Sequence, residues 1–370
     1  GCFLIGMIRS ALFRRIVRVV GVLVLLLFSS HVAAAEEAEF RIGAALPLTG
    51  ETATFGVDVK RGMELAVEDL AAKGVRSRLF FEDTQLVPRL AVSAAQKLIN
   101  QDKVQLLVSM WDTAEAVAPI AERAKVPHIS IRWNPRVAEE FAHTFTFEST
   151  YVTWIGETLD LVKRSGASRI SVMTDASGAG WVLAHENLLA QAKEKGLSVV
   201  TDVEVMAKDS EVNTAVTRLL SKPTDYIVLL QMGGLLRDVM GILQERHVTT
   251  PIIGYFEGTE DLPFAEGRPF IAQFESQPWF LEKFHQRYPG EVPMRAAFGY
   301  DLVSVLGDLI LKLGRQPTEA EILQHYNTLR AFKGATGEIS ANDRRNIETK
   351  CVVKEIRNGK PTLLNKAPTR

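Results

Sequence analysis

The hydrophobic positions of this chain follow two alternating spacings. From Phe40 onward, short apolar runs rich in Val and Ile are separated by longer segments with the helical period of about 3.6 residues. The apolar runs cover residues 40–47, 77–83, 104–110, 127–133, 169–175, 197–205, 225–232 and 251–257. The helical segments between them cover residues 59–74, 89–102, 114–125, 154–166, 182–196, 212–222 and 235–247. This alternation predicts an α/β fold with mostly parallel sheets flanked by helices.

The number of units predicts two lobes rather than one sheet in a single small domain. The pattern is interrupted at "HTFTFESTYVTW" and again at "FIAQFESQPWF", after which come helical segments and a strand-rich tail. No Pro-rich linker separates the halves, which favours lobes that share a hinge. We therefore assign residues 36–149 and 278–336 to the first lobe, and residues 150–277 and 337–370 to the second.

The ends of the predicted strands hold the candidate site. In open parallel sheets, ligands bind beyond the carboxyl ends of the strands. The stretches that follow the apolar runs are "LTGETATFG", "EDTQ", "SMWDTAE", "RWNP", "TDASGAG", "QMGG" and "YFEGTED". They contain hydroxyls, acids, glycines, aromatic side chains and one arginine, Arg132.

Arg132 and Trp133 stand out because they close an otherwise apolar strand, "VPHISIRWNP". A guanidinium can hold a ligand carboxylate through two parallel hydrogen bonds, and an indole can stack on a ligand or on the arginine. The alternatives are an arginine paired with a surface acid and a tryptophan that covers core.

Three further residues allow both a structural and a functional interpretation. Asp112 and Thr113 are good caps for the following helix, and a helix N-terminus is also a place where a ligand carboxylate can accept backbone N–H bonds. Glu257 follows a strand and precedes Gly258, so it is either a turn acid or a partner for a ligand ammonium group.

The sequence lacks the motifs of the common enzyme classes, so we predict no catalytic residue, no cofactor and no metal. In "SGAGW" the third glycine of a dinucleotide fingerprint is replaced by Leu183, and phosphate-loop and nucleophile-elbow motifs are absent. The seven histidines do not have metal-ligand spacing.

The first 35 residues are typical of a secretory signal peptide. Four arginines precede the apolar run "VVGVLVLLLF", and "SSHVAAAEEAEF" offers small residues for cleavage near Ala35. The chain opens on Gly1 while Met7 precedes the basic region, so residues 1–6 are interpreted as a misassigned start; a retained anchor is the alternative. After cleavage, 39 basic and 44 acidic side chains remain, with Cys351 as the one cysteine. We expect an exported periplasmic monomer without a nucleic-acid partner.

The order of segments resembles the branched-chain amino-acid (leucine/isoleucine/valine-binding) family of periplasmic binding proteins, from about Phe40 to Leu364. The resemblance rests on "RIGAALPLTGETATFGVDVKRGMELAVEDL", "FEDTQLVPRLAVSAAQKLINQDKVQLLVS", "AVAPIAERAKVPHIS", "FGYDLVSVL" and "FKGATGEIS". It implies a type I fold, in which two lobes joined by three crossings close on a small solute and present it to a membrane ABC permease.

The resemblance also implies ligand positions. Phe55 matches an aromatic at the cleft mouth, Asp112 and Thr113 match the loop that receives the ligand's carboxylate, and Glu257 matches the acid that holds its ammonium group. Gln231 begins the corresponding loop of the second lobe.

This chain departs from the family at the loop that holds Arg132 and Trp133, where a small Gly-Ala-Thr-like loop is usual. In the second lobe, Ala179 stands where a tyrosine is common, and the Gln231 loop offers no aromatic wall. These departures predict a ligand other than leucine, isoleucine or valine.

We therefore predict a solute-binding protein, not an enzyme, that captures an amino-acid-like or carboxylate-bearing ligand. Four alternatives stay open: a periplasmic sensor that signals to a membrane receptor; the same fold binding an aromatic acid or a dicarboxylate; the same fold binding an amide or urea compound; and a Rossmann-like enzyme.

Overall fold

The computed structural model describes residues 39–206, 211–256 and 261–364. By its internal contacts the chain divides into Gly1–Phe40 and Arg41–Arg370, and the sheets of both lobes belong to the second unit. The predicted signal peptide, residues 1–35, lies outside the described residues. None of the described helices is both long enough and apolar enough to cross a bilayer.

The first lobe is built on an eight-stranded sheet with the order β11-β12-β13-β5-β4-β3-β1-β2. Its strands are β1 Phe40–Leu46, β2 Ser77–Asp83, β3 Leu106–Met110, β4 His128–Ile131, β5 Thr144–Phe147, β11 Phe332–Gly334, β12 Gly337–Ala341 and β13 Asn346–Glu348. Its helices are α2 Ala53–Ala72, α3 Pro88–Asn100, η1 Trp111–Thr113, α4 Ala114–Ala124, α5 Arg136–Glu140, α10 Pro278–Arg287, α11 Ala296–Leu313 and α12 Glu319–Asn327. The pairs β1–β3, β3–β4, β4–β5 and β5–β13 are parallel, whereas β13–β12 and β12–β11 are antiparallel pairs at one edge of the sheet.

The second lobe is built on a parallel four-stranded sheet with the order β7-β6-β8-β9. Its strands are β6 Arg169–Asp175, β7 Ser198–Val205, β8 Tyr226–Leu230 and β9 Ile252–Gly254, and its helices are α6 Tyr151–Arg164, α7 Ala179–Glu194, α8 Val212–Leu219, α9 Gly233–Glu245 and the short η2 Pro263–Ala265. A small antiparallel sheet adds β10 Pro269–Ala272, β14 Val352–Arg357 and β15 Lys360–Leu363.

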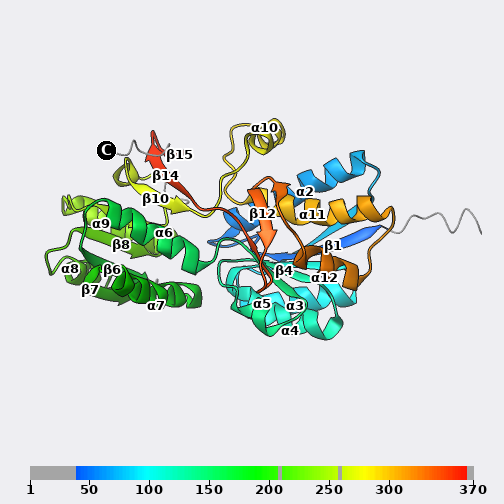
Figure 1. Ribbon diagram of the computed structural model, residues 1–370, viewed down its shortest axis with the longest axis horizontal. Coiled ribbons are helices and arrows are strands. Elements are labelled where there is room, and N and C mark those ends of the chain that lie inside the picture. The colour runs from blue at the N-terminus through cyan, green and yellow to red at the C-terminus, as the bar shows by residue number, and fades with distance from the viewer. Residues whose placement is uncertain (1–38, 207–210, 257–260, 365–370) are drawn as a thin grey trace, which may run out of the picture. The chain divides into compact units, whose positions relative to one another are not determined.

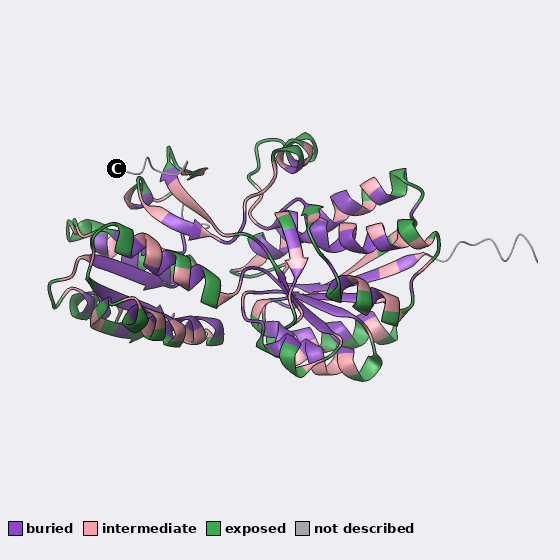
Figure 2. Ribbon diagram, in the orientation of Figure 1, coloured by how far each residue is buried: buried purple, intermediate pink, exposed green. Residues whose placement is uncertain are grey.

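Helices cover both faces of the four-stranded sheet, as the continuous apolar runs predict. Residues of α6 and α7 pack with one side of β6 and β8, while residues of α8 and α9 pack with the other. Figure 2 shows the strands of this sheet as buried between helices whose outer faces are exposed. The predicted fold class, two lobes with mostly parallel sheets flanked by helices, is confirmed.

One predicted lobe boundary is wrong. Residues 337–348, which we assigned to the second lobe, form β12 and β13 and pair with the sheet of the first lobe. The last crossing from the first lobe to the second therefore lies between β13 and β14, after residue 348. The pattern of apolar and polar residues did not identify the lobe, because both strands lie at or near a sheet edge, where this alternation does not reveal which sheet a strand joins.

Three segments cross between the lobes, and buried hydroxyl groups join them. Ser149 Oγ donates to the carbonyl oxygen of Thr349 at 2.6 Å, and the Ser149 backbone N–H donates to Thr349 Oγ1 at 3.0 Å. Thr349 Oγ1 in turn donates to the carbonyl oxygen of Gln273 at 2.7 Å. Because each crossing satisfies polar groups of another, the three segments form one connected hinge.

Close packing of α2 against α11 holds the first lobe together near this hinge. A Cβ atom on Gly62 would overlap the carbonyl oxygen of Ala296, and one on Gly299 would overlap that of Val59. Asp58 on α2 accepts backbone N–H bonds from residues 294–296, and its burial raises the pKa of the carboxyl to about 6. These contacts place Arg295, at the start of α11, beside the hinge.

Substituting Gly62 with alanine tests this packing. We expect Gly62→Ala to lower the free energy of unfolding by about 3 kcal/mol or more, because backbone atoms of two helices must move apart. Gly241→Ala in α9, where a Cβ meets nothing within 4 Å, should instead stabilise by about 0.5–1 kcal/mol. Urea unfolding monitored by circular dichroism measures both, and equal stabilities would contradict the packing described.

Candidate functional site

A cleft of about 820 Å³ lies where the carboxyl ends of the parallel strands of both lobes meet. Each loop that follows β1, β3, β4, β6 and β8 contributes to it, as the strand-end rule predicts. The lining residues from the first lobe and the first crossing are Glu51, Thr52, Phe55, Leu86, Trp111, Asp112, Arg132, Trp133, Glu148 and Arg295. Those from the second lobe are Asp175, Ser177, Gly178, Gly180, Trp181, Met232, Gly233, Gly234, Leu235, Asp238 and Tyr255.

Arg132 is buried, with 2% of its side chain exposed, although it lines the cleft. Its Nη1 donates to Glu115 Oε2 at 2.6 Å, and its Nη2 lies 3.7 Å from Asp112 Oδ1. Its Nε finds no hydrogen-bond partner among the described residues. The edge formed by Nε and Nη2, which is the edge that receives a carboxylate by two parallel bonds, therefore makes no hydrogen bond within the described part of the chain.

The two acids beside Arg132 are not buried as it is, and Asp112 also lines the cleft. About half of each side chain is exposed, 48% for Asp112 and 54% for Glu115. Desolvation by the cleft walls raises the pKa of Asp112, an effect that the charge of Arg132 partly offsets. Because both acids are partly exposed, water competes for their pairing with Arg132.

A second buried arginine, Arg295, lies at the base of the cleft, and the strand-end rule did not reveal it. Its Nη1 donates to Glu148 Oε1 at 2.6 Å, in a pair whose side chains are 2% and 1% exposed. Its Nη2 donates to Tyr255 Oη and to Gln273 Oε1. Arg295 thus connects the first lobe to the second lobe and to two of the three crossings. Glu148 could have been found by the strand-end rule, since it directly follows β5.

Trp133 belongs to the first lobe by its place after β4, yet its indole packs in the second lobe. It stacks on Trp154 with ring centroids 5.2 Å apart, and it meets Trp181 edge-on at 4.6 Å and Tyr255 at 5.9 Å. The second lobe therefore does present aromatic side chains to the cleft, although neither Ala179 nor the Gln231 loop supplies them. Trp181 stands two residues beyond Ala179, on the first turn of α7, and Tyr255 follows β9. Both line the cleft.

Phe55 and Trp111 form the aromatic part of the first lobe's wall. Their rings meet edge-to-face with centroids 5.1 Å apart. Trp111 begins the 3₁₀ turn η1 with a φ of 52°, in the left-handed region that non-glycine residues rarely adopt. This backbone turn follows β3 directly, at the cleft edge of the sheet.

Two of the remaining predicted site residues, Thr113 and Gln231, are not among the residues that line the cleft. Thr113 is 1% exposed, and its Oγ1 donates to the carbonyl oxygen of Met110 at 2.7 Å instead of capping α4. Gln231 is fully buried at the end of β8, and neither of its amide atoms has a hydrogen-bond partner among the described residues. Glu257 lies outside the described residues. Of the seven predicted residues, the cleft lining includes Phe55, Asp112, Arg132 and Trp133.

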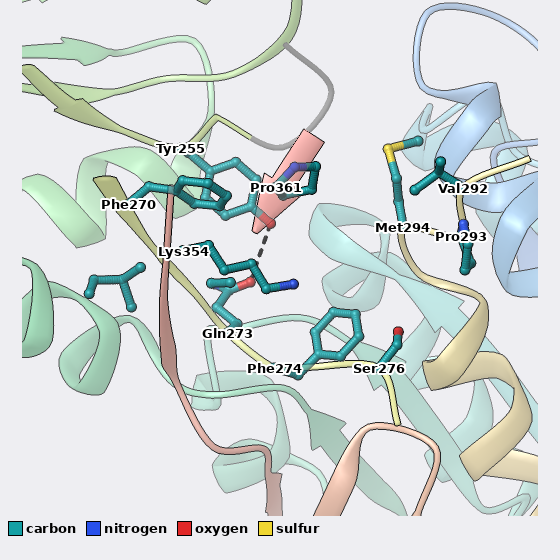
Figure 3. A pocket seen from close by; sticks show the side chains of 12 residues that line it. Tyr255, Phe270, Gln273, Phe274, Ser276, Val292, Pro293, Met294, Lys354 and Pro361 are labelled. Carbon is teal, nitrogen blue, oxygen red and sulfur yellow. Dashed lines mark hydrogen bonds between the residues drawn. The ribbon is translucent and has the colours of Figure 1, made fainter. Parts of the chain in front are cut away.

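A smaller pocket of about 70 Å³ lies beside the hinge (Figure 3). Val292, Pro293 and Met294 face it from one side, while Tyr255, Phe270 and Pro361 face it from the other. Tyr255 Oη donates to Gln273 Oε1 at 3.3 Å and forms part of both pockets. The volume of this smaller pocket is less than a tenth of that of the cleft, so we place a solute in the cleft. Among the described residues, no cluster of three or more His, Cys, Asp or Glu side chains could hold a metal ion.

Residues 39–360 match the model of a family described as periplasmic binding protein. The chain belongs to this family. A Leu/Ile/Val-binding protein homolog 3 from Brucella melitensis is 37% identical over 94 residues, 24% of this chain and 25% of that protein. Homolog 7 from Brucella abortus is 24% identical over 312 residues, 75% and 77% of the two chains. The match spans only a quarter of the first of these relatives and about half of a homolog 7 from Brucella suis.

Solved structures of other family members share the fold. A leucine-binding protein from Thermotoga maritima superimposes with a TM-score of 0.76 and 24% identity, over 88% of this chain and 98% of that one. A solute-binding protein from R. palustris in complex with 4-hydroxybenzoate gives 0.79 and 18%, over 88% and 96%. At these identities, the likeness establishes the fold alone.

The histidine that opens β4 predicts a pH dependence of stability. His128 is fully buried between Ser109 Oγ at 2.8 Å and Thr144 Oγ1 at 3.1 Å, and burial, aided by the charge of Arg132, lowers its pKa to about 3. The folded chain holds this ring neutral, so its contribution is complete above pH ~6.5 and is lost as the pH falls toward 3. We expect His128→Gln to remove up to about 1.4 kcal/mol per pH unit from the slope of unfolding free energy between pH ~6 and ~4. Urea titrations of both proteins test this, and parallel pH profiles would contradict it.

Proposed function

We propose that this chain is an exported solute-binding protein that captures a small carboxylate-bearing or amino-acid-like solute and delivers it to a membrane ABC permease. The observation that carries the proposal is the Nε–Nη2 edge of the buried Arg132, which lines the cleft; this edge makes no hydrogen bond within the described chain, and its one charged neighbour is the half-exposed Asp112 at 3.7 Å. Desolvated guanidinium groups bind carboxylates with two charge-assisted hydrogen bonds, and few other ligand groups match that geometry.

Capture proceeds by closure of the lobes around the solute. The solute's carboxylate binds Arg132 of the first lobe, and Asp112 turns toward water as it is replaced. Groups of the second lobe, with Gln231 and Glu257 as our candidates, then contact the other end of the solute. Gln231 is fully buried and does not line the cleft, so it reaches the solute only if closure turns its side chain toward the cleft; its amide has a donor and an acceptor without partners among the described residues. Motion about the hinge brings the two sets of contacts together.

An aromatic acid is the second candidate solute. Phe55, Trp111, Trp133, Trp181 and Tyr255 line the cleft, and flat rings stack well on such walls. The neighbour from R. palustris is in complex with 4-hydroxybenzoate, an aromatic carboxylate. An aliphatic amino acid would instead need an acid for its ammonium group, the role proposed for Glu257.

The proposed location is the periplasm, reached by a signal peptide cleaved near Ala35, and the proposed working form is a monomer. Membership of a periplasmic binding protein family supports this location. The permease is the partner that the solute-binding role requires. Nothing in the described site calls for a catalytic group, so we propose binding without turnover.

Substitutions at Arg132 test the proposed carboxylate site. We expect 4-hydroxybenzoate or benzoate to raise the melting temperature of the full chain, whereas benzamide, which lacks the negative charge, should not. Arg132→Lys keeps the charge but removes the Nε–Nη2 edge, and it should weaken binding of the active carboxylate by roughly 30-fold or more. Calorimetric titration gives the affinities.

Glu115→Gln is the matched control, because it removes the charge of an internal partner of Arg132 and leaves the edge intact. We expect this variant to bind the carboxylate as well as or more tightly than the native chain. Unchanged affinity in Arg132→Lys, with circular dichroism showing a folded protein, would remove Arg132 from the site.

A further inference from the structure

Two neighbouring side chains of one loop are held by different lobes. Arg132 pairs with Asp112 and Glu115 of the first lobe, whereas Trp133 packs in an aromatic cluster of the second. The residues between β4 and α5 are few, so a displacement of one side chain is transmitted to the other through a short stretch of backbone. The loop is also stiffened by Pro135 and by Asn134 Oδ1, which accepts the Arg136 backbone N–H at 3.1 Å.

Trp133 is bound to the second lobe by its ring and by its backbone. Its indole lies on that of Trp154 at an interplanar angle of 29°, and it meets Trp181 and Tyr255 at 78° and 81°. These are the offset-stacked and edge-to-face arrangements that aromatic pairs favour. Its carbonyl oxygen accepts the backbone N–H of Tyr151, the first residue of α6, at 3.1 Å.

The second lobe provides room for this indole through a glycine. A Cβ atom on Gly180 would lie 2.9 Å from Trp133 Nε1 and 3.5 Å from its Cε2. The first of these distances is shorter than side chains tolerate, so any larger residue would push the indole away from α7. Gly180 has a backbone conformation open to other residues, since its φ is not in the left-handed region. Its lack of a side chain therefore serves the contact with Trp133.

We propose that Trp133 is a latch between the lobes, a positioning residue whose indole seats the solute-binding loop of the first lobe in the second. The role of this latch rests on the proposed function, because a solute bound to Arg132 lies one residue away from the contact that holds the lobes together. Solute binding and lobe closure are thereby coupled through a single loop, with Gly180 as the receiving surface.

Distances between the lobes test the latch without any solute. Spin labels are placed at Arg123→Cys on α4 and Glu194→Cys on α7, both exposed, in the full chain carrying Cys2→Ser and Cys351→Ser. Pulsed electron–electron double resonance then gives the distribution of distances between the two spin labels, and so between the lobes. We expect Gly180→Ala and Trp133→Ala each to broaden or shift this distribution in the same direction, although they alter opposite sides of the contact.

Two further variants separate the latch from a general loss of packing. Gly241→Ala adds a methyl group to α9 of the second lobe, at a residue that does not line the cleft and where a Cβ meets nothing within 4 Å, and it should leave the distribution unchanged. Trp133→Phe keeps a ring for Trp154 and Trp181, so it should restore most of the native distribution. Circular dichroism of each variant verifies that it is folded.

The outcomes distinguish the latch from the proposed function. Native-like distributions in both Gly180→Ala and Trp133→Ala would overturn the latch, even if carboxylates bind. A changed distribution in both, with no carboxylate binding to the native chain, would support the latch and refute the proposed ligand class. If 4-hydroxybenzoate binds, we expect both variants to release it roughly tenfold faster than Gly241→Ala does, by stopped-flow tryptophan fluorescence.

Discussion

The base of the cleft depends on the hydrogen bonds that the buried guanidinium of Arg295 makes. Placed at the start of α11, it reaches Glu148 of the first crossing, Tyr255 of the second lobe and Gln273 of the second crossing. A charge this deeply buried is tolerated only if it is paired and hydrogen-bonded, so each of these groups is constrained by the same cation. The close packing of α2 and α11 at Gly62 and Gly299 brings the cation to this position.

The two arginines of the cleft illustrate different uses of the same chemistry. Arg295 has fully buried partners, and removing either member of its pair with Glu148 would leave an uncompensated charge in the protein interior. Arg132 is equally buried, but its acidic partners are half exposed and one edge of its guanidinium makes no hydrogen bond within the described chain. The first arrangement suits a permanent structural role. The second suits exchange of partners, which a solute-binding group requires.

The aromatic side chains combine packing with recognition. Trp133, Trp154, Trp181 and Tyr255 contact one another, so they form part of the core of the second lobe, yet three of them also border the cleft. A rigid wall of this kind loses little side-chain freedom when a flat ligand binds. The departure of this chain from the small loop usual after β4 thus changes the structure as well as the pocket, because Trp133 joins the lobes.

Much of the fold, and the place of four of the seven predicted site residues at the cleft, followed from the sequence, since local periodicity records how a segment is buried. Continuous apolar runs indicated strands covered on both faces, and the carboxyl-end rule located Arg132 and Trp133. Periodicity does not record which partner a segment packs against. The strands β12 and β13 were therefore assigned to the wrong lobe, and Arg295 was missed because its position depends on the packing of two helices distant in sequence. Only the tertiary structure decided that Arg132 faces the acids of one lobe while Trp133 enters the core of the other, because the contacts available to each side chain come from segments that the chain brings together by folding.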